Sequence, residues 1–134
     1  MTTIQHIEGQ DWGDPSGDGS SLIQRCTRLR RKPLTDFTVE DLRVMLGQGL
    51  AVSILLPLAV DVLVTDPLVE GDYYPGDLLE EVLRLPHSAW ASMPERRQQL
   101  AAALANLDPV GAGLPKTSHD AVMSLVRQHV PPAR

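Results

Sequence analysis

The stretch DPLVEGDYYPGDLLEEVLRL, residues 66–85, is the segment around which the rest of the chain is organised. Its first part holds two prolines, two glycines and both tyrosines, and its second part has apolar residues at helical spacing. We expect Asp66-Pro67 to end one helix, because proline disfavours the helical conformation of the residue before it. A turn is expected around Gly71. Pro75 fits the first turn of a new helix, where its missing N–H costs nothing.

The same stretch gathers six carboxylates and a single basic residue, Arg84. Helical spacing predicts one apolar face, formed by Leu78, Leu79, Val82, Leu83 and Leu85, and an opposite face formed by Asp77, Glu80, Glu81 and Arg84. This acidic face is either a solvated helix surface or a docking surface with two tyrosines at its edge. The candidate partner-binding residues are Asp66, Glu70, Asp72, Tyr73, Tyr74, Asp77, Glu80 and Glu81.

Charge is segregated along the chain around this stretch. Between Arg43 and Arg84 there is no lysine or arginine, whereas seven acidic residues occur. Such a patch steers a basic partner and raises association rates by roughly 10–1,000-fold at low salt. Tyrosines commonly anchor protein interfaces. The pattern therefore favours a small binding protein whose partner is basic.

Length and composition predict an all-α fold. The chain has 134 residues, of which 43% are hydrophobic and 4% aromatic, so one core built mainly from Leu, Val and Ala is expected. We predict a single-domain compact bundle of about six to seven short helices, with no strand. Residues 1–18 are expected to form a flexible lead-in, with Trp12 as an anchor onto the body. Residues 19–134 form the helical domain, with a loop over residues 107–117 before the C-terminal helix.

The helices are expected over residues 21–30, 39–48, 54–65, 75–85, 88–93, 94–107 and 118–129. The first carries its apolar face on Leu22, Ile23, Cys26 and Leu29. Thr38 and Asp41 have the spacing of a capping box at the start of the second, with Asp in place of the usual Glu. The third is apolar on nearly all sides, which predicts that it forms the centre of the core.

The residues that could support catalysis lack a suitable arrangement. Cys26 lies on an apolar helix face, which favours a buried small hydrophobe, and a single cysteine excludes an internal disulfide. The four histidines, His6, His87, His119 and His129, lack the spacing of a metal site. Ser118, His119 and Asp120 are adjacent in the chain and cannot converge as a hydrolase triad; they are expected to cap a helix. We therefore predict a protein that is not an enzyme and has no cofactor or metal.

Two further partner classes are disfavoured. The net charge of −5 argues against nucleic acid as the main partner. A basic cluster at residues 25–32 could contact phosphate, but a solvated or intramolecularly paired face is the alternative. The most apolar run, residues 50–64, is too short to span a bilayer, and the N-terminus lacks a secretory signal. A cytoplasmic location is expected.

Several motifs resemble the immunity proteins of contact-dependent growth inhibition (CDI) systems, the CdiI group. They are CTRLRRKPL (26–34), FTVEDLR (37–43), GQGL (47–50), LPLA (56–59) and, the most specific, DPLVEGDYYPGDLL (66–79); WGDP (12–15) resembles the lead-in of that group. The resemblance covers residues 11–86, and the segment after Arg97 resembles nothing that we can place.

The resemblance implies an intracellular antidote. Such proteins bind the toxic C-terminal domain of a matching toxin and block it, often by covering its active site, and many of these toxins are nucleases. An acidic surface that fills a basic cleft agrees with the charge pattern. The alternatives are a helical adaptor with a partner other than a toxin, and an enzyme or nucleic-acid-binding domain. The residues alone leave the toxin's activity and the oligomeric state open.

Overall fold

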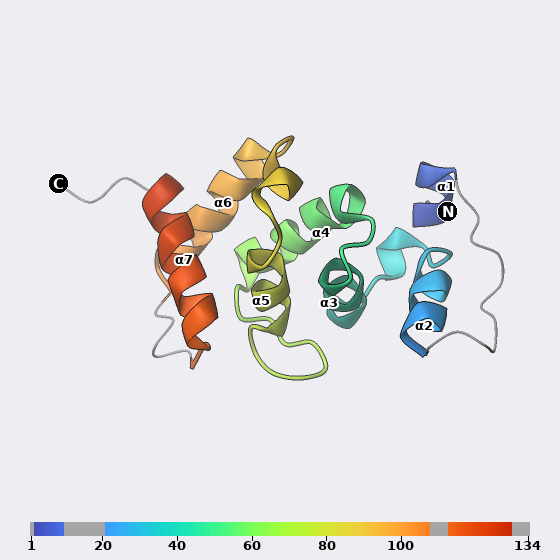
Figure 1. Cartoon of the computed structure of the whole chain (residues 1–134), viewed down its shortest axis with the longest axis horizontal. Helices are drawn as coiled ribbons and strands as arrows, with labels where there is room; N and C mark the ends of the chain where they lie inside the picture. The colour runs from blue at the N-terminus through green and yellow to red at the C-terminus, as the bar shows by residue number, and fades with distance from the viewer. Residues whose placement is uncertain (1, 10–20, 108–112, 130–134) are drawn as a thin grey trace.

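The fold is all-α, as expected, and Figure 1 presents it as a computed structural model that describes residues 2–9, 21–107 and 113–129. Within these ranges it has seven α-helices and two short 3₁₀ helices. They are α1 (Ile4–Glu8), α2 (Ser21–Leu29), η1 (Leu34–Asp36), α3 (Val39–Gly47), α4 (Val52–Thr65), α5 (Asp77–Leu83), η2 (His87–Trp90), α6 (Pro94–Leu104) and α7 (Lys116–His129). The only extended pairing in these ranges is an isolated antiparallel bridge between Glu70 and Pro75.

Helix α4 is the centre of the core, as its apolar composition predicts. Its fully buried side chains are Leu55, Leu56, Ala59, Val60 and Leu63. It packs against α3, α5 and α6, so that three helices cover it on different sides (Figure 1). No helix in the described part of the chain is long and apolar enough to cross a membrane.

Local signals start and stop several helices at the expected residues. Thr38 Oγ1 accepts a hydrogen bond from the Asp41 N–H at 3.1 Å, and Asp41 Oδ2 accepts one from the Thr38 N–H at 3.0 Å. The predicted capping box is thus confirmed. Asp66 ends α4, in agreement with the restriction that Pro67 imposes on it.

The predicted start of α5 was wrong. Pro75 lies outside the helix, in the bridge with Glu70, and Gly76 is the residue that precedes the first helical turn. Gly76 has φ +90°, a left-handed conformation that favours glycine, and an added Cβ would lie 2.9 Å from Leu114 Cδ2. The residue directly before α5 therefore needs a positive φ, which glycine adopts and proline cannot.

Several predicted faces and ends differ from the structure. On α2, Cys26 and Leu29 are buried, but Leu22 and Ile23 are exposed, so its apolar face is narrower than expected. Helix α6 ends at Leu104, before the expected residue 107. Helix α7 begins at Lys116, so that Ser118 is buried within the first turn instead of capping it.

Helix α1 was not anticipated within the expected lead-in. Thr3 caps it, Ile4 is fully buried, and the Gln5 N–H donates to the Arg30 carbonyl at 2.9 Å. Arg30 is itself buried and forms an ion pair with Glu8. These contacts dock the first residues onto the end of α2. Trp12 and residues 108–112 of the predicted loop lie outside the described residues.

The central position of α4 predicts a steep contrast between neighbouring residues. Leu63→Ala should lower the free energy of unfolding by about 2–5 kcal/mol, because it removes a fully buried side chain from a packed core. Val64 is 43% exposed, and Val64→Ala should change the free energy of unfolding by about 0.5 kcal/mol or less. Urea denaturation measures both, and equal losses would contradict the central role of α4.

Candidate functional site

The loop between α4 and α5, residues 66–76, is hereafter the acidic loop. Its backbone is fixed by the carboxylate of Asp77, which begins α5. Asp77 Oδ1 accepts a hydrogen bond from the Gly71 N–H at 2.7 Å, and Oδ2 accepts from the Tyr73 N–H at 3.1 Å. Asp77 is only 3% exposed. It therefore acts as an internal acceptor that holds the turn closed.

A second carboxylate holds the acidic loop from α3. Glu40 Oε1 accepts a hydrogen bond from the Asp72 N–H at 3.0 Å, across 32 positions in the chain. The Arg43 guanidinium donates to both oxygens of Glu40, with Nε 2.6 Å from Oε1. Gly71 fits between the two carboxylates because it lacks a side chain: an added Cβ would lie 2.7 Å from Glu40 Oε1 and 2.9 Å from Asp77 Oδ2.

The charges around Glu40 stabilise one another. Hydrogen bonds from Arg43 lower the pKa of Glu40; burial opposes this effect, and the Asp72 N–H reinforces it. The same pairing raises the pKa of Arg43. Arg25 adds a more distant contact, 4.0 Å from Glu40 Oε2. The Glu40–Arg43 pair is therefore ionised at neutral pH, and its two charges balance each other.

Arg43 also supports an exposed aromatic side chain of the acidic loop, Tyr73. Its guanidinium lies over the Tyr73 ring, 4.5 Å from the ring centroid. Such cation–π contacts contribute about 0.5–2 kcal/mol. Tyr73 is nevertheless 69% exposed. The ring is thus held on one side by Arg43 and presented to solvent on the other.

Tyr74 is held differently. Its hydroxyl donates a hydrogen bond to Glu80 Oε2, and Glu80 Oε1 accepts one from Arg84 Nη2 at 2.9 Å. Glu80 is buried, whereas Tyr74 is 41% exposed. Arg84 also lies 3.8 Å from Glu81, which is half-buried. Tyr74 therefore serves the internal packing of α5 more than Tyr73 does.

The eight candidate residues differ in their exposure to solvent. Five are exposed, namely Asp66, Glu70, Asp72, Tyr73 and Tyr74, and Glu81 is half-buried. The placement of Asp77 and Glu80 on a solvent-facing side of the helix was wrong, since both are buried. They are turned inward because the N–H groups of a tight loop and the Tyr74 hydroxyl require acceptors. A contact of any of the eight with a partner stays a prediction.

Sequence reasoning missed the two α3 residues that support the loop. Glu40 and Arg43 lie about thirty positions before it, and nothing in their spacing indicates where they point. Their only signal is that Arg43 is the last basic residue before the acidic run. Asp77 had a clearer signal, because an aspartate directly after a glycine-rich turn often accepts hydrogen bonds from turn N–H groups.

The basic cluster is largely paired within the protein. Lys32 Nζ lies 2.6 Å from Asp41 Oδ2, and Arg25 Nη2 lies 3.9 Å from Asp41 Oδ1. Burial would raise the pKa of Asp41, but hydrogen bonds from Lys32 and Thr38 outweigh burial and lower it. The intramolecular alternative for this cluster is thus confirmed for these two cations and for Arg30.

Catalytic chemistry gains no support from the other candidates. Cys26 is buried, and burial raises the pKa of its thiol, as expected for a core residue. His119 Nδ1 lies 3.2 Å from Asp120 Oδ1 near the surface, while Ser118 is buried. Over residues 2–9, 21–107 and 113–129, no group of His, Cys, Asp or Glu is arranged to hold a metal ion.

The lowered pKa of Glu40 predicts a specific dependence of stability on pH. The ordinary pKa is 4.5, so the stabilisation is fully present above that pH and is lost as pH falls through the lower value of the folded protein. Glu40→Gln should be less stable than the wild type at about pH 7, and the difference should shrink as the pH falls below 4.5. Denaturant titrations at several pH values measure this difference. Glu95→Gln removes a carboxylate at an exposed position and serves as the control.

Comparison with known proteins assigns the chain to a family. A comparison with curated proteins found no match. The family model of CDI immunity proteins matches residues 6–100. The matched segment contains the whole acidic loop and both supporting α3 residues, and it extends beyond the 11–86 span of the sequence resemblance. Since the match covers well over half of the 134 residues, the chain belongs to the family of CDI immunity proteins.

Proposed function

We propose that this immunity protein binds the C-terminal toxin domain of its cognate CDI toxin and that the acidic loop covers a basic active-site surface of that domain. The observation that supports this proposal is the construction of the loop. Asp66, Glu70 and Asp72 are exposed, and their carboxylates form no ion pair within the described part of the chain. Unpaired surface acids leave a negative field for a basic partner.

The loop is arranged before any partner arrives. Backbone hydrogen bonds to Glu40 and Asp77 fix the residues that carry the exposed charges. A surface that is already ordered loses less conformational entropy on binding. Tyr73 supplies a large ring that few interactions within the protein cover. Charge steers the encounter and the ring supplies apolar contact, which is the usual division of roles at tight interfaces.

A nuclease is the toxin class that this surface fits best. An enzyme that cleaves nucleic acid needs a positively charged site for the phosphate backbone. A rigid acidic surface competes for the same site without being cleaved. We therefore propose inhibition by occupation of the active site, in the cytoplasm, without turnover and without a cofactor. The family membership favours a toxin partner over the adaptor alternative.

The direct test is calorimetric binding to the toxin C-terminal domain encoded immediately upstream, at low and at physiological salt. Tight, salt-sensitive 1:1 binding that abolishes toxin activity supports the proposal. Tight binding with an affinity independent of salt concentration would show that the acidic loop is not part of the interface. A lack of binding between two folded proteins would overturn the proposed partner.

Neutralising the exposed acids of the acidic loop should slow the association of the protein with the toxin domain. The triple variant Asp66→Asn, Glu70→Gln, Asp72→Asn should slow association at least about tenfold at low salt and flatten its salt dependence. The loop should stay folded, because its hydrogen bonds to Glu40 and Asp77 use backbone N–H groups. Stopped-flow or surface-based kinetics measure the rates.

A matched triple variant separates local from total charge. Asp36→Asn, Glu95→Gln and Asp120→Asn change the net charge equally at exposed positions outside the loop. This variant should retain an association rate within about threefold of the wild type, because it leaves the exposed charges of the acidic loop in place. Equal slowing by both variants would show that only total charge matters.

Tyr73 should be an energetic anchor. Tyr73→Ala should weaken toxin binding about 30-fold or more, mainly through faster dissociation, because exposed aromatic anchors commonly contribute about 2 kcal/mol. Tyr73→Phe keeps the ring over Arg43 and should bind nearly as the wild type does. Val64→Ala truncates another exposed side chain and serves as the control. Unchanged dissociation of Tyr73→Ala would place the anchor elsewhere.

A further inference from the structure

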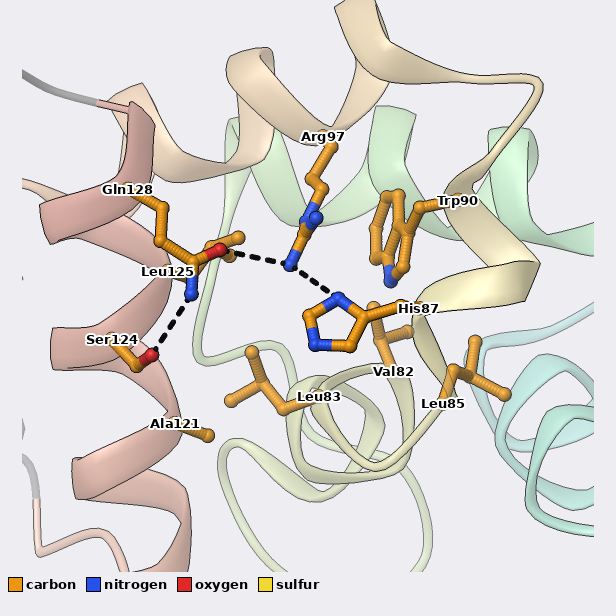
Figure 2. A pocket seen from close by; sticks show the side chains of 10 residues that line it. All are labelled: Val82, Leu83, Leu85, His87, Trp90, Arg97, Ala121, Ser124, Leu125 and Gln128. Atoms are coloured by element: carbon orange, nitrogen blue, oxygen red, sulfur yellow. Dashed lines mark hydrogen bonds between the residues drawn. The ribbon is translucent and has the colours of Figure 1, made fainter.

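A second concave surface lies away from the acidic loop, where α5, η2, α6 and α7 meet (Figure 2). It encloses about 180 Å³. Leu83, Leu85, Trp90 and Leu125 give it apolar walls, and the side chain of Arg97 reaches into it from α6. Polar side chains, those of His87, Ser124 and Gln128, complete the lining. Apolar walls combined with a few placed polar groups are the usual form of a recognition site.

Arg97 is the unusual residue in this pocket. Its Nη2 lies 3.1 Å from His87 Nδ1 and donates to Gln128 Oε1 at 3.2 Å, so both of its partners are neutral when the imidazole is unprotonated. Its Nε is buried and has no hydrogen-bond partner among the residues that the structure describes. No carboxylate of the described residues lies within ion-pair distance of Arg97, whereas its neighbour Arg96 pairs with Asp61. Within the described part of the chain, Arg97 is therefore a positioned cation without an anionic partner.

The surroundings hold Arg97 in one orientation. Gln128 accepts from Arg97 and donates through its own Nε2 to Ser124 Oγ at 3.3 Å, which links α6 to α7 (Figure 2). His87 Nδ1 contacts the same Nη2 nitrogen from its other side (Figure 2). A guanidinium fixed in this way binds a carboxylate at a smaller entropic cost than a mobile surface arginine does.

We propose that this pocket receives a glutamate or aspartate side chain of the toxin domain, with its carboxylate on Arg97 and its methylene carbons against the leucines. The proposal rests on the proposed function, because it takes the toxin as the partner. The chemistry of the pocket selects such an occupant: the cation requires an anion, the apolar walls require hydrocarbon, and the volume suits a single side chain. The acidic loop and this pocket then present opposite charges to one partner, which fixes its orientation.

The pocket is also placed to discriminate among toxins. The wall formed by Leu83, Leu85, His87 and Arg97 lies within the residues that match the family, which end at residue 100. The wall formed by Ser124, Leu125 and Gln128 belongs to α7, outside the match. The unpaired cation is thus on the matched side, and α7 determines the shape that an occupant must fit. A toxin that lacks an acid at this point would leave Arg97 desolvated and unpaired, which disfavours the wrong partner.

Binding of the full-length protein to the toxin domain tests the role of the pocket. Arg97→Gln should weaken binding at least tenfold, and Arg127→Gln, which removes an equal charge at an exposed position of α7, should stay within about twofold of the wild type. Ser124→Phe leaves Arg97 intact and fills the pocket from an exposed helix position, so it should weaken binding similarly. Circular dichroism and thermal melts confirm that each variant is folded. If folded Arg97→Gln and Ser124→Phe bind as the wild type does, the proposal is overturned.

A small-molecule probe tests the pocket without the toxin. In the free protein, N-acetylglutamate methylamide at millimolar concentration should shift the NMR signal of the Trp90 indole N–H, which Trp12→Phe identifies. The glutamine analogue should not shift it, and Arg97→Gln should abolish the response. Equal shifts with both analogues, no shift, or a response to inorganic phosphate alone would each overturn the assignment to an acidic side chain. If the wild-type protein fails to bind the toxin, the proposed function fails, and this titration alone decides whether the pocket takes a carboxylate.

Discussion

The buried carboxylate of Glu40 is the constraint on which the acidic half of the molecule depends. A charge removed from water is tolerated only when it is paired and hydrogen-bonded, and Glu40 meets both conditions through Arg43 and the Asp72 N–H. In doing so it connects α3 to a loop that follows the next helix. Arg43 then continues the connection to the Tyr73 ring. One ion pair thus helps to position Tyr73, the most exposed aromatic side chain of the described residues.

This arrangement explains why so many acids occur in one stretch. Asp77 and Glu80 face inward and satisfy donors of the loop and of Tyr74, whereas Asp66, Glu70 and Asp72 face solvent. The first group makes the loop rigid, and the second gives it its field. In the proposed function both groups serve specificity, because a rigid charged surface penalises a mismatched partner that a flexible one would accommodate.

The molecule carries charge of opposite sign at two separate places. The acidic loop is built from α3, α5 and the chain between α4 and α5, all within the residues matched by the family model. The Arg97 pocket combines a wall from the matched residues with one from α7, which lies beyond them. The two places therefore differ in construction as well as in charge: the acidic loop lies wholly within the matched residues, and the pocket extends beyond them.

The sequence by itself determined the features that depend on neighbours along the chain. The capping box at Thr38, the end of α4 before Pro67 and the apolar α4 core could be predicted, because each rests on local stereochemistry or periodicity. The family membership could be anticipated from the resemblance of several motifs. Tertiary structure alone decided that Glu40 supports Asp72, that Asp77 faces inward, and that Arg97 contacts His87 and Gln128 instead of any carboxylate of the described residues. Hydrogen bonds and desolvation depend on which distant groups are brought together, and residue spacing within a single helix carries no information about that.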